Sequence, residues 1–171
     1  MGIFLAQVAV SGMLLGAMTP GAAPHLAIAR SVAGAGLPQC TSYLADGTAQ
    51  PCLPSFSIRQ SRQINGWSEH GRIAFSRAAL ERLTPDEFAL LAGHEIAHWY
   101  LGHKGSNPAD ELAADRLGAK LACEAGYDPA KGAGLFRYLG QGTDHPPRKA
   151  RVAAVLAVPC PQAAHQSFSS R

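Results

Sequence analysis

Charge is absent from the beginning of this 171-residue sequence: the first 29 residues contain no Asp, Glu, Lys or Arg. They include an apolar run, IFLAQVAVSGMLLGAM, which is followed by helix-breaking and small residues. This pattern is typical of a secretory signal peptide over residues 1–29, with cleavage near residues 23–29. An uncleaved N-terminal anchor is the alternative, although the run is shorter than the ~20 apolar residues of a membrane-spanning helix.

Further absences narrow the class of protein. No second apolar run of similar length follows, so we expect no membrane span in the mature chain. The basic residues are scattered and the net charge is only +3, which argues against nucleic-acid binding. None of the four cysteines has the C-x-x-C spacing of a zinc or redox pair, so we assign them no metal. We therefore expect an exported protein, periplasmic or extracellular, that binds no nucleic acid and has no membrane span in its mature chain.

Cysteine number and export together favour disulfides. An even number of cysteines in an exported chain predicts two bridges, and we favour Cys40–Cys52 and Cys123–Cys160. Four buried thiols are the alternative.

The rest of the chain divides into three segments. Residues 30–55 are rich in Gly, Pro, Ser and Ala and predict an irregular N-terminal segment. Residues 56–160 contain the periodic patterns of one folded domain, and residues 161–171 predict a flexible tail. Alternating apolar and polar residues predict strands over residues 56–67 and 72–76, joined by a tight turn.

Helical patterns dominate after residue 78. Thr84, Pro85 and Glu87 form a capping box with proline at the first helical position, which predicts a helix over residues 85–101. Pro108 opens a second helix, expected over residues 108–124, and shorter helices are expected from Pro129 and over residues 148–158. The predicted fold is α+β, a helical bundle with a small antiparallel sheet.

The first long helix contains the pattern H-E-x-x-H. Residues four apart lie about 40° apart around a helix, so His94 and His98 share one face and can bind one metal ion. Glu95 is rotated about 100° from His94, too far for a comfortable third ligand but close enough to reach a metal-activated water. This arrangement predicts a hydrolase in which Glu95 is the general base and acid.

A third ligand is needed to complete such a site. If the helix continued, His103 would lie nine residues from His94, roughly on the opposite face, so we reject it unless the chain unwinds at Gly102. Glu111 fits better, because the short GHKGSNP connection makes the two long helices antiparallel neighbours. Two His, one Glu and an open position are typical of catalytic zinc.

Acidic neighbours of Glu111 are given different roles. Asp115 follows Glu111 by four residues and could accept the free N–H of a ligating histidine. Asp110 is expected to lie outside the site.

Three quoted motifs carry a resemblance to a known family. The motifs are HEIAHWYLGH, ELAADRLGAKLACEAGYDP and DHPPRKAR. Together they resemble the M48 family of zinc metallopeptidases, which are gluzincins, and in particular the compact soluble branch of that family. The likeness runs from about Asn65 to Val158. It implies one zinc ion held by His94, His98 and Glu111, and a metallopeptidase domain over residues 56–160.

The resemblance also implies roles near the C-terminus and in the sheet. His145 would approach the cleft and stabilise an oxyanion, and Arg151 would brace Asp115 or contact the substrate; both could equally be surface residues. The predicted strand over residues 72–76 resembles the edge strand on which such peptidases bind an extended peptide. Its residues are Arg72, Ile73, Ala74, Phe75 and Ser76.

The implied activity is that of a zinc endopeptidase that cleaves extended or unfolded proteins. Two alternatives remain open from the sequence. The first is a zinc-bearing binding or chaperone-like module without proteolysis, and the second is a structural helical hairpin without metal.

Overall fold

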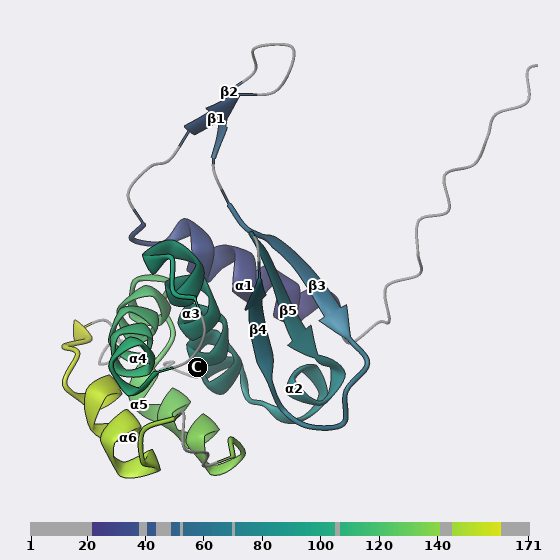
Figure 1. Ribbon diagram of the computed structural model, residues 1–171. Coiled ribbons are helices and arrows are strands. Elements are labelled where there is room, and N and C mark those ends of the chain that lie inside the picture. The colour runs from purple at the N-terminus through teal and green to yellow at the C-terminus, as the bar shows by residue number, and fades with distance from the viewer. Residues whose placement is uncertain are drawn as a thin grey trace, which may run out of the picture.

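A computed structural model describes residues 22–37, 41–43, 49–51, 53–69, 71–104, 107–140 and 145–161. The strands are β1 (Thr41–Tyr43), β2 (Ala49–Pro51), β3 (Ser55–Arg59), β4 (Gly66–Glu69) and β5 (Arg72–Ser76). The helices are α1 (Ala22–Gly34), α2 (Arg77–Arg82), α3 (Pro85–Leu101), α4 (Pro108–Glu124), α5 (Pro129–Gly132), the 3-10 helix η1 (Ala133–Arg137) and α6 (Arg148–Leu156). Figure 1 shows α3 between the sheet of β3, β4 and β5 and helix α4. The fold is α+β, as the sequence predicts.

The three-stranded sheet is mixed, not antiparallel as expected, and it corrects two further predictions. The strand expected over residues 56–67 is interrupted, and its two parts, β3 and β4, lie on opposite sides of β5. β3 pairs with β5 in parallel, whereas β4 pairs with it antiparallel. β5 is thus the central strand with both edges hydrogen-bonded, so the expectation of a peptide-binding edge at residues 72–76 is wrong. β4 is the edge strand that packs on α3.

Helix α3 begins and ends where its sequence signals place it. The Thr84 side chain accepts a hydrogen bond from the Glu87 backbone N–H, and the Glu87 side chain accepts one from the Thr84 backbone N–H. These two bonds satisfy backbone donors that a helix start would leave unpaired. At the other end Gly102 adopts φ 68°, a left-handed conformation that suits glycine and turns the chain away from the helix axis.

Helix α4 crosses α3 at very short range. A Cβ added to Gly118 would lie 2.6 Å from the backbone nitrogen of His94, and one added to Gly93 would collide with the Gly118 backbone. Two helices approach this closely only where both lack side chains, so the glycine pair sets the separation of α3 and α4. The crossing adjoins the H-E-x-x-H motif.

Helix α1 contributes to the same core. Its residues Leu26, Ala29 and Val32 are buried, and the ring of His25 packs edge-on against Phe88 of α3. The segment expected to be irregular, residues 30–55, therefore contains the end of α1 and the β1–β2 hairpin. Cleavage near residues 23–29 stays a prediction. None of the described helices is long and apolar enough to cross a membrane.

The C-terminal region is held by one of the two predicted disulfides. Cys123 in α4 is bonded to Cys160 beyond α6, which confirms that pairing. Cys40 and Cys52 lie outside the described residues. The helix expected from Pro129 is short and passes into 3-10 geometry at Ala133, in keeping with the glycines at 132 and 134.

Replacing Gly118 with Ala should destabilise the protein by about 1–3 kcal/mol, because the new methyl group must push the two helices apart. Helix propensity alone would favour alanine by about 1 kcal/mol, so the sign of the change reports the steric effect. Urea denaturation measures it. Gly34→Ala at the end of α1 is the matched control, since an added Cβ there meets no atom within 4 Å. Equal stability of the two variants would contradict the close crossing.

Candidate active site

His94 and His98 face each other along one side of α3. Their Nε2 atoms are 3.0 Å apart, and the two rings are nearly perpendicular, at 81°. The side chains are only 10% and 12% exposed. The spacing of one helical turn therefore produces the juxtaposition that the sequence predicts.

Glu111 reaches this pair from the first turn of α4. Its Oε1 lies 3.4 Å from Nε2 of His98 and its Oε2 lies 3.6 Å from Nε2 of His94. In the part of the chain that the structure describes, these three residues form a group that could hold a metal ion, with ligand atoms within 4.8 Å of one another. The short connection between α3 and α4 thus brings Glu111 close to the two histidines.

The dimensions and ionisation of the group fit a small divalent cation. Zinc–nitrogen bonds of about 2.0–2.1 Å in a tetrahedral site place neighbouring donor atoms about 3.3 Å apart, close to the separations observed. Burial alone would raise the pKa of Glu111, but its hydrogen bond with His98 and the charges of His94 and Arg151 lower that pKa to about 2. For His98, burial lowers the pKa, and Glu111 and Glu95 more than offset this and raise it. The Glu111 carboxylate is therefore ionised near neutral pH, as a metal ligand must be.

Asp115 lies behind His94. Its Oδ1 is 2.9 Å from Nδ1 of His94, and both of its oxygens accept hydrogen bonds from the Arg151 guanidinium, at 2.7 and 2.8 Å. Asp115 is 1% exposed and Arg151 4% exposed, so this is a fully buried ion pair. Burial tends to raise the pKa of Asp115, yet the hydrogen bonds from Arg151 and His94 lower it overall. Asp115 can fix the orientation of His94, and Arg151 fixes that of Asp115.

His103 does not lie where the sequence analysis placed it. The left-handed residue Gly102 reverses the chain, and Nδ1 of His103 comes within 3.0 Å of Nδ1 of His98. Its Nε2 lies 3.6 Å from Asp110 Oδ1. The group of His94, His98 and Glu111 does not include His103. His103 contacts His98, and Asp110 contacts His103, so the expectation that both lie outside the site is wrong.

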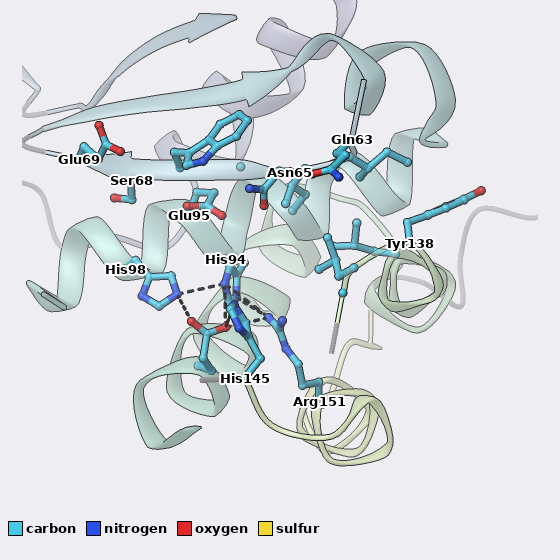
Figure 2. Close-up of a pocket in the computed structure, with 18 of the residues that line it drawn as sticks. Gln63, Asn65, Ser68, Glu69, His94, Glu95, His98, Tyr138, His145 and Arg151 are labelled. Carbon is cyan, nitrogen blue, oxygen red and sulfur yellow. Dashed lines mark hydrogen bonds and ion pairs between the residues drawn. The ribbon is translucent and has the colours of Figure 1, made fainter. Parts of the chain in front are cut away.

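Glu95 occupies the gap between the histidines and the sheet (Figure 2). It is buried, and an added Cβ on Gly66 of β4 would lie 2.6 Å from its carboxylate. Only a glycine at this point of the strand leaves room for the Glu95 side chain. Burial raises the pKa of Glu95 and repulsion from Glu111 adds to this rise, whereas His94, His98 and Arg151 oppose it.

An open cleft of about 1070 Å³ is lined by most of the residues described above, namely His94, Glu95, His98, His103, Glu111 and Arg151. His145 is 42% exposed at its edge, and its Nε2 is 3.8 Å from Glu111 Oε2, so it does approach the cleft. Sequence reasoning missed several other lining residues, namely Arg62, Asn65, Gly66, Trp67, Arg82 and Tyr138. Only Gly66 carried a usable signal, because a glycine inside a strand indicates close approach by another group.

Replacing Arg151 with Met should lower the free energy of unfolding by about 3–5 kcal/mol at neutral pH, because it leaves the Asp115 carboxylate buried without its partner. The native pKa of Asp115 lies below its ordinary value of 3.8, so wild type has this stabilisation above that pH and loses it as the pH falls through the native pKa. The stability difference between wild type and variant should therefore shrink in acid. Chemical denaturation across pH tests this, with Arg148→Met, an exposed residue of the same helix, as control.

Comparison with known proteins gives one match. Residues 37–109 match the family model described as peptidase family M48, and no curated protein or solved structure matches the chain. The matched segment contains the three-stranded sheet and His94, Glu95 and His98, and it ends before Glu111. In sequence and in the arrangement of its candidate ligands, the chain resembles peptidase family M48, which supports a metallopeptidase activity at the level of the family.

Proposed function

We propose that the protein is a zinc-dependent endopeptidase that cleaves extended or unfolded polypeptides. The observation that carries the proposal is the buried His94, His98 and Glu111 group at the floor of an open cleft, with the Glu95 carboxylate beside it. A structural metal site would be closed by a fourth protein ligand, whereas this group leaves one side open to the cleft. The match to peptidase family M48 adds independent support.

The three ligands suit zinc in their chemistry. Two imidazole nitrogens and one carboxylate oxygen are a donor set that catalytic zinc uses. A zinc ion held there supplies Lewis acidity, which lowers the pKa of water and polarises a carbonyl group. Asp115 can accept a hydrogen bond from Nδ1–H of His94, a tautomer that leaves Nε2 of that ring free to bind.

Glu95 is the proposed proton carrier. Its carboxylate accepts a proton from a water molecule as the water oxygen attacks the peptide carbonyl carbon. The C–N bond then breaks, and the same carboxyl group donates that proton to the leaving nitrogen. Burial favours this role, because it raises the pKa of Glu95 and so brings the protonated form within reach.

The edge strand β4 is the proposed binding element for the substrate. Its free edge borders the cleft, and Gly66 lies against Glu95. An extended peptide can pair with such an edge through main-chain hydrogen bonds, for which its own backbone groups must be unpaired. This favours unstructured substrates.

His145 and Arg151 receive separate roles. His145 is exposed at the edge of the cleft and could donate a hydrogen bond to a developing oxyanion. Arg151 is buried against Asp115, which favours a positioning role over contact with substrate.

We also propose that the protein is exported to the periplasm or the extracellular space. The charge-free apolar N-terminus and the Cys123–Cys160 disulfide support this, since disulfides persist in oxidising compartments.

Glu95→Gln should abolish cleavage of a denatured protein such as casein while zinc stays bound at one ion per chain, because the amide cannot accept the proton. Activity is measured by gel and metal content by mass spectrometry. Removing zinc with a chelator should also stop cleavage, and adding zinc should restore it. Glu124→Gln, an exposed residue at the end of α4, is the control. Bound zinc with no cleavage by wild type would instead favour a non-proteolytic binding module.

His103→Ala should weaken zinc binding by about 10–100-fold, because His98 loses the partner that orients its ring. A competition titration with a chromophoric chelator measures the dissociation constant. Lys120→Ala, on the exposed side of α4, should leave it unchanged. Unaltered affinity in the His103 variant would show that the contact does not orient the ligand.

A further inference from the structure

A second, smaller cavity adjoins the cleft at one end. It has a volume of about 370 Å³, and Arg62 and Arg82 line both it and the cleft. The two hollows therefore share these two side chains. Both arginines are exposed and accessible to a molecule bound in the cleft.

The shared end carries positive charge that no carboxylate of the described residues pairs with. The second cavity is also lined by Arg77 and Glu81, but these two form an ion pair with each other at 2.7 Å. Within the described residues, no carboxylate lies within ion-pair distance of Arg62 or Arg82. Two positive charges thus face the same hollow with no carboxylate partner among the described residues.

Arg82 is held in place by an aromatic ring. Its guanidinium lies 5.4 Å from the centre of the Tyr138 ring, within the range of a cation–π contact. Tyr138 in turn lies under Arg137, which is ion-paired with the buried Glu87. A side chain restrained in this way loses less conformational freedom when it binds an anion than a freely moving arginine does.

The position of the two arginines relative to the reacting groups can be judged from the direction of β4. Gly66 lies against Glu95 and so marks the level of the scissile bond. Arg62 precedes Gly66 by four residues, whereas Glu69, at the other end of the strand, is paired with Arg59. Figure 2 shows the same polarity: Asn65 and Tyr138 lie on one side of Glu95, and Ser68 and Glu69 lie on the other.

We propose that Arg62 and Arg82 form a subsite for a carboxylate that lies after the scissile bond of the substrate, an inference that rests on the proposed function. β4 runs from Gly66 to Glu69, so a peptide added in the commoner antiparallel sense runs from Glu69 towards Arg62. Arg62 lies in a bend four residues before the first residue of β4, so the carboxylate belongs to one of the second to fourth substrate residues after the scissile bond. The preferred substrates carry Asp or Glu there.

Matched peptides test this subsite. Each has an amidated C-terminus and carries Asp or Glu, or the neutral Asn or Gln, at one of the four positions before or after a common cleavage point. Wild type should cleave peptides with an acid at the second to fourth positions after that point about tenfold faster than their amide counterparts. Raising the salt concentration should reduce the difference. Equal rates, or a preference only before the cleavage point, would overturn the proposal.

Variants locate the preference on the two arginines. Arg62→Ala with Arg82→Ala should remove the acid preference, while the corresponding double Lys variant, which keeps the charge, should retain most of it. Arg116→Ala is the control, since this exposed arginine lies on α4 and lines neither hollow. An undiminished preference in the double Ala variant would assign the subsite elsewhere.

The carboxylate could also be the C-terminus of the substrate. Peptides with a free C-terminal carboxylate at the same positions and no acidic side chain distinguish the two sources. Faster cleavage of these alone, with no effect of Asp or Glu, would overturn an acidic side-chain preference.

Binding to the Glu95→Gln protein separates this proposal from the proposed function. Fluorescence anisotropy of labelled peptides should give about tenfold tighter binding for the acidic member of a pair, whether or not wild type cleaves it. If casein is cleaved but acidic and amide peptides bind equally, the subsite is wrong and the peptidase stands. If the acidic peptides bind tighter and nothing is cleaved, the peptidase is wrong and the subsite stands.

Discussion

The backbone contact between α3 and α4 at Gly93 and Gly118 is the constraint on which the rest of the site depends. His94 follows Gly93 directly, and Asp115 lies just under one turn before Gly118. Side chains larger than hydrogen at the crossing would separate the helices and carry the carboxylates of α4 away from the imidazoles of α3. A contact of 2.9 Å between His94 and Asp115 therefore requires two residues that themselves have no functional group.

Charged side chains are buried near the crossing of α3 and α4, and ion pairs between them stabilise their burial. Glu111, Asp115 and Arg151 are each less than 5% exposed, a state that would cost several kcal/mol per ion without partners. Arg151 from α6 binds Asp115 and approaches Glu111 to 3.4 Å, so one cation serves both acids. The fold thus keeps Glu111 and Asp115 of α4 ionised, while burial and, to a smaller extent, repulsion from Glu111 raise the pKa of Glu95, on which Arg151 has little effect. Different roles for three nearby carboxylates follow from their surroundings.

The floor of the site could be predicted from the sequence because it depends on local geometry. Helical periodicity places His94 and His98 on one face, and the capping signals at Thr84 fix where that helix begins. The helix is predicted to end before Gly102, but the pattern does not give the path of the chain beyond that residue, and a single residue with positive φ turns the chain back on His98. The local sequence pattern therefore predicts that a helix exists more reliably than it predicts where the chain goes after the helix ends.

The walls of the cleft depend instead on pairing between distant segments. Alternating residues predict strands at β4 and β5 alike, and nothing in the alternation tells which one is central. That order is set by the parallel pairing of β3 with β5, which leaves β4 as the edge against α3. Gly66 is the residue from which the edge strand could have been predicted correctly. A strand glycine marks close approach by another group, and the Glu95 side chain is the group that requires the space. A strand beside the helix that carries Glu95 needs that gap, whereas a central strand lined by Ile73 and Phe75 fills the core.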